Sequence, residues 1–326
     1  MGQAAEPVDA VYTWVDGRTP RFAHDVQLAG ARADGLVADV RKRRFRDNGE
    51  LRYSMRSLVR FAPWLHRIFL VTNGDVPAWL DRHNDRVQVV THAELFDTTD
   101  DLPTFNSNAI EMHLHRIPGL SRKFLYLNDD VFFGRPCTLA EFSDRGTDFF
   151  LFETQRCASD SEHGEVHDRA YAHTARRVSV VTGYPLLTLL PAHTPQLYDR
   201  EVISRCAEQF RTDFQATASN RMRRPTDFVL RIAYAAVGLG AGRMKERILD
   251  WGSSDYTFLS LDDRPLLLLR NLLRIRVRRP RFYCLNDDLG DVSPNHLVLR
   301  LVRWFLRAYY PQRTAFETNH RETRRQ

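Results

Sequence analysis

The 326-residue sequence carries 47 Lys and Arg residues against 41 Asp and Glu residues, a formal net charge of +6, and 43% of its residues are hydrophobic. An aromatic content of 11% argues against a disordered chain, and the length predicts either one large α/β domain or a core domain with a substantial insertion. Nearly all of the basic residues are arginines, which bind phosphate through paired hydrogen bonds. The charge therefore indicates an anionic ligand or, alternatively, a solvated basic surface.

The cysteines and the N-terminus bear on the cellular compartment. Four cysteines lie far apart without a CxxC pair, which disfavours a zinc site or a disulfide scaffold: Cys137, Cys157, Cys206 and Cys284. The first six residues have neither the basic start nor the apolar core of a signal peptide. The longest leucine run, Leu266 to Leu269, is too short to cross a bilayer. We therefore expect a cytoplasmic protein.

The first half of the chain alternates strand-like and helix-like segments, which is typical of βαβ units and predicts a largely parallel sheet. The expected strands are Val8–Val15, Arg67–Thr72, Val87–Thr91, Lys123–Leu127 and Asp148–Phe152. A helix is expected over Asp47–Phe61, where Asp47 and Glu50 have the spacing of a capping pair. A second helix is expected over Ser107–Arg116 and is stopped by a Pro-Gly pair.

The second half is less regular. Residues from Glu153 to about Val178 are polar, arginine-rich and contain histidines, and we interpret them as a loop or an inserted subdomain. Pro195–Phe210 is a helix candidate with Thr194 as its cap. Arg281–Leu285 is expected to form a strand, and a final helix is expected over Ser293–Tyr310. The charged tail that follows is expected to be mobile.

Two acidic turns follow apolar strands. Asn128-Asp129-Asp130 ends the fourth strand, and Asn286-Asp287-Asp288 ends the strand near the C-terminus. In open α/β sheets ligands bind beyond the carboxyl ends of the strands, and carboxylates placed there suit Mg²⁺ or Mn²⁺. Each turn alone is also an ordinary Asx turn, but two turns brought together would supply enough oxygens for one metal ion.

Three further candidates each have a structural alternative. His193 precedes the predicted helix at Pro195, and the positive end of a helix dipole would keep its imidazole neutral, as a general base requires. Glu111 has the spacing of a capping partner for Asn108, so its chemistry alone does not select it. The arginines that precede Pro225 could hold phosphoryl oxygens or form a solvated basic loop: Arg221, Arg223 and Arg224.

Four segments carry specific sequence patterns. The first is DAVYTWVDG (Asp9–Gly17), and the fourth is RFYCLNDDL (Arg281–Leu289). The third lies around PAHTP and continues to Arg223-Arg224-Pro225-Thr226-Asp227. The second comprises RFRDNGELRYSMRSL (Arg44–Leu58), APWLHRIFLVTNG (Ala62–Gly74), VVTHAELF (Val89–Phe96) and LPTFNSNAIEMHLHRIPGLSRKFLYLNDDVFFG (Leu102–Gly134). In these segments the chain resembles the Stealth family, which includes bacterial capsule polysaccharide phosphotransferases and the precursor of the lysosomal-enzyme N-acetylglucosamine-1-phosphotransferase.

The resemblance implies a fold and an activity. The expected fold is a Rossmann-like, nucleotide-sugar transferase (GT-A-like) α/β core with a mostly parallel sheet and a helical or loop insertion. The expected reaction moves a hexose 1-phosphate, with N-acetylhexosamine 1-phosphate favoured, from a UDP-sugar to a polysaccharide or lipid-linked glycan, and releases UMP. We expect one catalytic domain over residues 1–326. Its parts are a nucleotide-sugar-binding half (1–153), a loop-rich and helical part (154–280), and a closing strand, helix and tail (281–326).

The resemblance also implies roles for individual residues. The family's catalytic histidine falls on His193, its functional acids on Glu111 and Asp130, and its functional arginine on Arg223. His193 would accept the hydroxyl proton, Arg223 would stabilise phosphoryl charge, and Glu111 would orient the acceptor or a metal-bound water. The residues expected at the nucleotide are Asp16, Arg52, Asn73 and Asn128. The residues expected at Mg²⁺ or Mn²⁺ are Asp130, Asn286 and Asp287.

Other interpretations stay open. A glycosyltransferase on a similar core would break the sugar–oxygen bond and release UDP. A basic protein that binds nucleic acid or membrane would need a recognised module or aromatic-interleaved basic patches, so we expect no nucleic-acid partner. The terminal helix carries Arg300, Arg303 and Arg307 beside Trp304, which suits peripheral contact with an anionic membrane. Packing of this helix on the core is the alternative.

Overall fold

The computed structural model describes residues 6–32, 45–156 and 165–318. Arg44, Cys157 and the tail from residue 319 onward therefore lie outside the described residues. The largest sheet has the order β3-β2-β1-β4-β9, with β1 to β4 mutually parallel and β9 antiparallel to β4. Its strands are β3 (Val87–Thr91), β2 (Ile68–Thr72), β1 (Val8–Thr13), β4 (Lys123–Asn128) and β9 (Gln196–Asp199). The predicted α/β class and mostly parallel sheet are thus confirmed.

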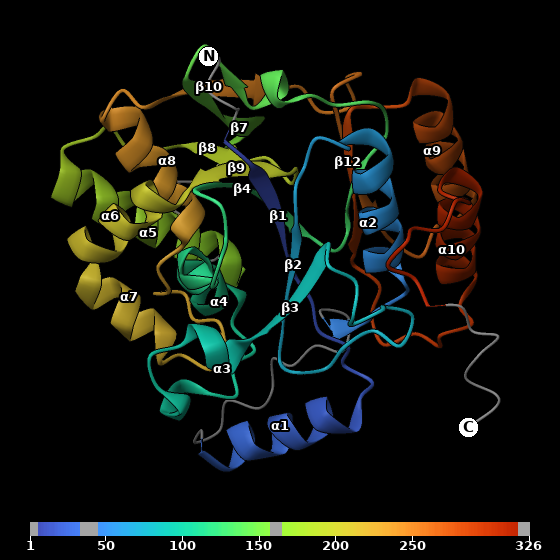
Figure 1. The fold of residues 1–326 in the computed structure, drawn as a ribbon, viewed down its shortest axis with the longest axis horizontal. Helices are drawn as coiled ribbons and strands as arrows, with labels where there is room; N and C mark the ends of the chain where they lie inside the picture. Colours follow the sequence, from blue (N-terminus) through green and yellow to red (C-terminus); the bar gives the residue numbers. More distant parts are fainter. Residues whose placement is uncertain (1–5, 33–44, 157–164, 319–326) are drawn as a thin grey trace.

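Helices cover both faces of this sheet, as Figure 1 shows, because both faces of its strands are apolar. Val11, Phe69 and Tyr126 pack toward one face, while the neighbouring residues Tyr12 and Leu70 pack toward the other. The first face is covered by α4 (Ser107–His113), α6 (Arg200–Gln209) and α8 (Leu230–Gly240). The second face is covered by α2 (Glu50–Phe61).

The remaining strands form two smaller sheets. One has the order β11-β12-β5, and the other has the order β10-β7-β6, with β8 paired to β7. Their bounds are β5 (Val131–Phe133), β11 (Tyr256–Leu261), β12 (Phe282–Asp287), β6 (Ser143–Asp144), β7 (Thr147–Arg156), β8 (Leu189–Pro191) and β10 (Met244–Leu249). The remaining helices are α1 (Pro20–Arg32), α3 (His92–Leu95), α5 (Val166–Thr182), α7 (Arg211–Ala218), α9 (Pro265–Arg278) and α10 (Leu297–Tyr309), with 3₁₀ turns at Thr99–Asp101, Leu114–Arg116 and Leu139–Glu141.

Two local predictions for the middle of the chain are corrected. The stretch interpreted as a loop or an inserted subdomain is not only a loop, because it contains the 17-residue helix α5, whose buried residues Tyr171, Ala175 and Val178 recur at helical spacing. The helix predicted over Pro195–Phe210 is instead strand β9 followed by α6. Antiparallel pairing with β4 holds residues 196–199 in an extended conformation. Tertiary structure therefore overrides the local preference for a helix start at Pro195.

The predicted caps of α2 and α4 are also corrected. Helix α2 begins after Gly49, whose φ of 91° lies in the left-handed region that favours glycine. Asp47 accepts a hydrogen bond from the Gly49 amide at 2.7 Å, so it shapes the turn before the helix instead of capping it. Helix α4 is capped by Asn106, whose side chain accepts from the Asn108 amide at 3.1 Å.

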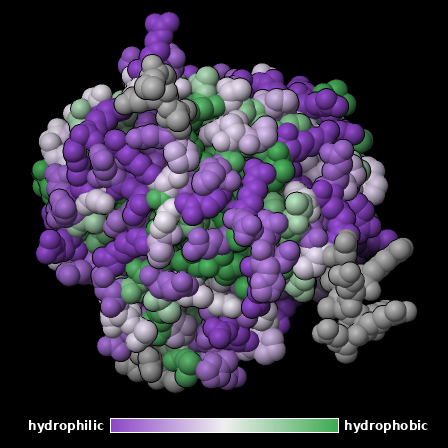
Figure 2. All heavy atoms as spheres, viewed as in Figure 1, coloured by the Kyte–Doolittle hydropathy of each residue, from purple (hydrophilic) through white to green (hydrophobic). Residues whose placement is uncertain are grey.

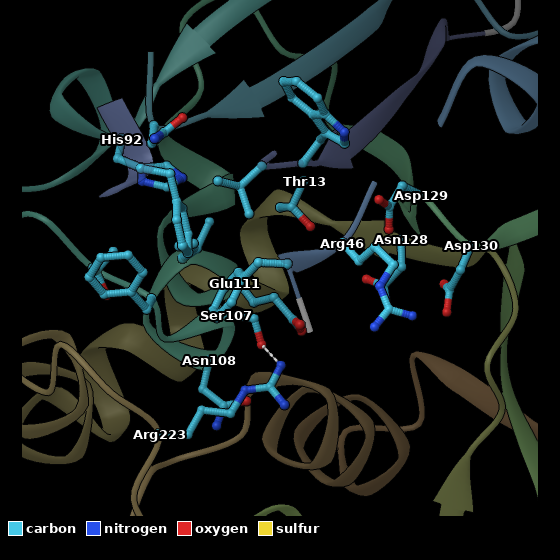
Figure 3. A pocket seen from close by; sticks show the side chains of 18 of the residues that line it. Thr13, Arg46, His92, Ser107, Asn108, Glu111, Asn128, Asp129, Asp130 and Arg223 are labelled. Carbon is cyan, nitrogen blue, oxygen red and sulfur yellow. Dashed lines mark hydrogen bonds between the residues drawn. The ribbon is translucent and has the colours of Figure 1, made fainter. Parts of the chain in front are cut away.

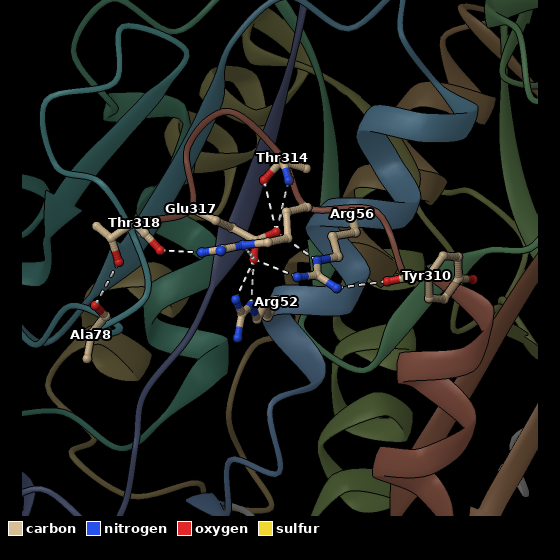
Figure 4. Close-up of polar contacts among 8 residues, drawn as sticks. Arg52, Arg56, Ala78, Tyr310, Thr314, Glu317 and Thr318 are labelled. Atoms are coloured by element: carbon tan, nitrogen blue, oxygen red, sulfur yellow. Dashed lines mark hydrogen bonds and ion pairs between the residues drawn. The ribbon is translucent and has the colours of Figure 1, made fainter. Parts of the chain in front are cut away.

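Part of the predicted mobile tail is fixed to the core, as Figure 4 shows. The Glu317 carboxylate accepts hydrogen bonds from Arg52 and Arg56 of α2, each at 2.7 Å. The Thr318 amide donates to the Trp79 carbonyl at 2.9 Å. Residues 310–318 therefore form a strap across α2, with a buried carboxylate at its centre.

The face seen in Figure 2 is mostly hydrophilic, with apolar residues visible toward its middle. Within the described ranges, no helix combines the length and the apolar content needed to cross a membrane.

Candidate functional site

A cavity of about 880 Å³ lies at the carboxyl ends of the four parallel strands. Its walls include Trp14 after β1, Asn73 after β2, His92 after β3 and Asn128 at the end of β4. In the sheet, β2 and β3 lie on one side of β1, and β4 lies on the other side. In open α/β sheets a crevice forms at the point where the strand order reverses in this way. A cavity of ligand size therefore lies beyond the strand ends, where the sequence predicted a ligand site.

Most of the residues selected from the sequence line this one cavity, although they come from distant segments. They are Asn73, Glu111, Asn128, Asp130, His193, Arg223, Asn286 and Asp287. In Figure 3, Ser107 and Glu111 of α4 lie on one side of the view, and Asn128, Asp129 and Asp130 lie on the other.

Two residues expected at a nucleotide do not line the cavity. Arg52 is engaged by Glu317 at 2.7 Å and lies with its guanidinium 5.7 Å from the centre of the Trp79 ring. Asp16 forms a hydrogen-bonded pair with the exposed Arg18, at 2.9 Å and 3.0 Å. The structure therefore does not bring Arg52 to the cavity, because its side chain is engaged by Glu317 of the C-terminal strap.

Glu111 is held by an arginine that the sequence analysis did not select. Arg231 of α8 donates from Nε to Glu111 Oε2 at 3.2 Å and from Nη2 to Asn128 Oδ1 at 3.4 Å. Its guanidinium also lies 5.2 Å from the centre of the Tyr126 ring, and the Glu111 and Arg231 side chains are both 8% exposed. Arg231 therefore fixes Glu111 to the end of β4 across the cavity wall.

Arg223 reaches the cavity from a loop that is tied to α4. Its Nη2 donates to Ser107 Oγ at 2.5 Å, the contact drawn in Figure 3. The loop itself is fixed by the buried Asp227, which accepts hydrogen bonds from Asn106 at 2.8 Å and from the Arg224 amide at 2.9 Å. The Arg223 guanidinium is thus held by Ser107 on an anchored loop, and it keeps donors that an anionic ligand could use.

His193 lines the cavity beside an aromatic ring. Burial, and then the charge of Arg231, lower the pKa of His193 to about 4, so its imidazole is neutral near pH 7. Its Nδ1 is buried and finds no hydrogen-bond partner among the described residues. The ring centre lies 5.0 Å from that of Phe258. The neutral state was predicted for the wrong reason, because strand β9, not a helix, follows His193.

The two acidic turns lie side by side, as predicted. Strand β12 pairs with β5, and the Leu285 amide donates to the Asp130 carbonyl at 3.0 Å. Asp130 Oδ2 accepts from the Cys284 thiol at 3.3 Å, whereas Oδ1 is buried and finds no partner within the described part of the chain. Burial raises the pKa of Asp130. Burial and then the charges of Asp130 and Glu50 raise the pKa of Asp129. This end of the cavity concentrates negative charge.

The expected set of metal ligands is only partly available. Asp287 accepts from Arg46 at 3.0 Å, from the Asn48 side chain at 3.3 Å and from the Leu289 amide at 3.0 Å, so both of its oxygens are occupied. Across the described ranges no three His, Cys, Asp or Glu side chains form a ready metal cluster. Asp129 and the open oxygen of Asp130 nevertheless fit a hard cation that takes its remaining ligands from a substrate or water.

An aromatic wall borders the cavity near β1. The rings of Phe22 and Phe105 meet edge to face with centres 5.3 Å apart, and Phe45 packs 4.9 Å from Phe22. Trp14 also lines the cavity, and its buried Nε1 finds no acceptor in the described structure. The cavity thus offers planar apolar surfaces and one unused donor to a ligand.

Sequence reasoning missed several lining residues, including Arg231 and Phe105, whereas Arg46 and Glu50 lie in the Arg44–Arg52 stretch that was expected to help build the nucleotide pocket. Arg231 is the single charged residue of an otherwise apolar helix, LRIAYAAVGLG, and that isolation was a usable signal. Glu50 was interpreted as a capping residue, yet it is buried, and burial followed by the charge of Asp47 raises its pKa to about 8. No sequence pattern linked the Phe residues to each other.

Three conserved regions of one protein family match this chain. Stealth protein conserved region 2 matches residues 44–149, conserved region 3 matches residues 192–234, and conserved region 4 matches residues 273–326. These matches include Glu111, Asp130, His193 and Arg223.

Individual relatives agree with those matches. An exopolysaccharide phosphotransferase of Streptomyces coelicolor is 35% identical over 98% of this chain and 53% of its own length. Mouse N-acetylglucosamine-1-phosphotransferase subunits alpha/beta are 60% identical over 30% of this chain and 8% of their own length. The chain spans about half the length of the bacterial relative. Among solved structures, the galactosyltransferase LgtC crystallised with donor and acceptor sugar analogues has a TM-score of 0.46 and 11% identity over 97% of this chain and 99% of its own.

Proposed function

The chain belongs to the Stealth family, and from that premise we propose that it is a sugar-1-phosphate transferase. It moves a hexose 1-phosphate, preferentially an N-acetylhexosamine 1-phosphate, from a UDP-sugar to a glycan hydroxyl during synthesis of capsule or cell-surface polysaccharide. The names of the bacterial and mouse relatives support the phosphotransferase class. The observation that carries the proposal is the cavity that gathers His193, Asp130, Glu111 and Arg223.

The reaction we propose is a displacement at the phosphorus that bears the donor sugar. The acceptor oxygen forms a bond to this phosphorus, the bond from phosphorus to the bridging diphosphate oxygen breaks, and UMP leaves with that electron pair. The bond between the sugar's anomeric carbon and its oxygen stays intact. The acceptor's proton passes to His193, whose lowered pKa of about 4 keeps the ring able to accept it.

Two arginines support the charges of this reaction. Arg223 presents its guanidinium beside Ser107 and would hold the oxygens of the transferred phosphoryl group. Arg231 already holds Glu111 and Asn128, so its role is to keep Glu111 pointed into the cavity. Glu111 in turn would accept a hydrogen bond from the acceptor and orient its hydroxyl for attack.

The acidic end of the cavity would hold Mg²⁺ or Mn²⁺. Asp129 and Asp130 are the proposed ligands, because the Asp130 Oδ1 atom is open and, after burial, the Asp130 charge raises the pKa of Asp129. A bound cation would neutralise the diphosphate of the donor. Asp287 would act indirectly, since its contacts with Arg46 and Asn48 hold the second acidic turn in place.

The uracil ring would rest on the aromatic wall of Phe22, Phe45 and Phe105, in the cavity that the unused Nε1 donor of Trp14 also lines. This placement leaves the diphosphate to run toward the acidic end of the same cavity.

The nucleotide released tests the proposal. The protein is incubated with Mg²⁺, a panel of UDP-sugars and glycan acceptors, and the products are separated by chromatography. UMP should appear in proportion to a phosphodiester-linked product. Stoichiometric UDP would instead identify a glycosyltransferase and overturn the phosphotransfer reaction.

A further inference from the structure

Helices α9 and α10 leave large apolar side chains in solvent. Leu266 and Val277 of α9 are 83% and 81% exposed, and Trp304 and Leu297 of α10 are 52% and 51% exposed. The opposite sides of both helices are buried against β12 and its neighbours. The buried stripes consist of Leu268, Leu272 and Ile275 on α9 and Val298, Leu299, Val302, Phe305, Leu306 and Tyr309 on α10. The fold therefore does not explain the exposed apolar residues.

The two helices run side by side in the same direction. His296, just before α10, lies 3.3 Å from Asp263, just before α9. Near the other ends, the Arg276 guanidinium lies 4.9 Å from the centre of the Tyr309 ring. Figure 1 shows both helices together along one edge of the molecule. Because their buried stripes share one core, their outer sides form one surface, the α9–α10 surface, which includes Leu266, Leu273, Val277, Leu297 and Trp304.

This surface carries only positive charge on its helices. Helix α9 contributes four arginines and α10 three, and neither helix contains Asp or Glu. Six of these seven arginines are exposed, and no carboxylate of the described residues forms an ion pair with any of the six. Arg276 stacks on Tyr309 and Arg278 donates to the Gly252 carbonyl, so four exposed arginines remain open to a ligand: Arg270, Arg274, Arg300 and Arg307. Exposed leucines and a tryptophan among unpaired arginines match the boundary between lipid headgroups and acyl chains.

We propose that the α9–α10 surface binds an anionic lipid bilayer. Leu266, Val277 and Trp304 enter the headgroup boundary, and the arginines meet lipid phosphates. A second copy of the chain fits this surface poorly, because its own arginine rows would face those of the first copy and repel them. The proposal concerns attachment alone and does not depend on the transfer reaction, so a failure of one leaves the other testable.

The test is sedimentation of the protein with vesicles. In about 0.01 M salt, where charges act over about 30 Å, the wild-type protein should sediment with phosphatidylglycerol vesicles and stay in solution with phosphatidylcholine vesicles. At about 1 M salt, binding to the anionic vesicles should fall at least about tenfold. Replacement of Arg270, Arg274, Arg300 and Arg307 by Gln should lower the affinity at low salt by more than about tenfold without a change in melting temperature.

Matched variants separate this surface from a general effect of charge or apolar area. A control protein carries Gln at four exposed arginines elsewhere, Arg82, Arg169, Arg205 and Arg211, and should bind like the wild type. Leu266→Ser with Val277→Ser should weaken binding several-fold, whereas Val180→Ser, which changes an equally exposed residue of α5, should not. Three results would overturn the proposal. The first is no vesicle binding at low salt, and the second is an equal loss of binding in both arginine variants. The third is the formation of concentration-dependent dimers that the Leu266 and Val277 changes abolish.

Discussion

The strap that closes over α2 gives a stability prediction with a calculable size. Arg56, the Thr314 amide and Arg52 all donate to Glu317, and despite the opposing effect of burial they lower its pKa from 4.5 to about 2. A shift of about 2.5 units corresponds to about 3.4 kcal/mol of stability near neutral pH. Arg52 is partly exposed, so solvent screens some of this energy, and we expect Glu317→Gln to cost about 1–3 kcal/mol.

The sign of this effect sets its pH dependence. A carboxylate with a lowered folded pKa stabilises the protein above its unfolded pKa of about 4.5, and this contribution disappears as the pH falls toward about 2. The difference in unfolding free energy between wild type and Glu317→Gln should therefore reach its full size near pH 7 and fall to less than half of that size near pH 3.

Urea unfolding followed by tryptophan fluorescence measures both values. Asp97→Asn is the matched control, because Asp97 pairs with Arg116 on the surface, and its loss should cost less than about 1 kcal/mol. The reasoning would be refuted by equal urea midpoints for wild type and Glu317→Gln near pH 7. It would also be refuted if the difference in unfolding free energy between them stayed the same at low pH.

Four further changes probe the cavity. Arg231→Met should destabilise the protein by about 3–5 kcal/mol, because it leaves the Glu111 carboxylate buried without a counter-charge. The double variant with Glu111→Met should recover much of this loss, and equal thermal stability of the single and double variants would contradict the pairing. His193→Ala should lower kcat while UDP-sugar affinity in calorimetry stays within a few-fold, and the wild-type rate should show no ionisation near pH 6.5, since the folded pKa lies at about 4. Asp130→Asn should stay folded and lose about a hundredfold in rate, and EDTA should abolish turnover that Mg²⁺ or Mn²⁺ restores; full activity without metal would exclude this assignment. Phe105→Ala should weaken UDP binding about tenfold, and an unchanged affinity would move the uracil site elsewhere.

The parallel strands could be predicted because their apolar runs are short, rich in branched and aromatic residues and closed by polar turns. Arg67–Thr72 and Lys123–Leu127 differ from the observed strands by one residue at an end. The position of the acidic turns could be predicted for the same reason, because polar residues directly after a buried strand lie at the edge of the sheet. This edge is where Asp130 and Asn286 were found.

What could not be predicted depends on contacts between distant segments. Strand β9 forms because β4 supplies a partner, and a local helix signal at Pro195 has no information about that partner. Arg52 looked like a pocket residue until Glu317, far along the chain, was found to hold it. Arg231 lies on an apolar helix, and only the fold brings its guanidinium to Glu111.

The central claim is that phosphorus, and not only sugar, reaches the glycan. A UDP-sugar labelled with ³²P at the phosphorus next to the sugar tests this most directly, with the wild-type protein, a divalent cation and an acceptor glycan. The account predicts that the label moves into the glycan and that the released UMP is unlabelled. Label recovered in UDP, with an unlabelled glycan product, would contradict it.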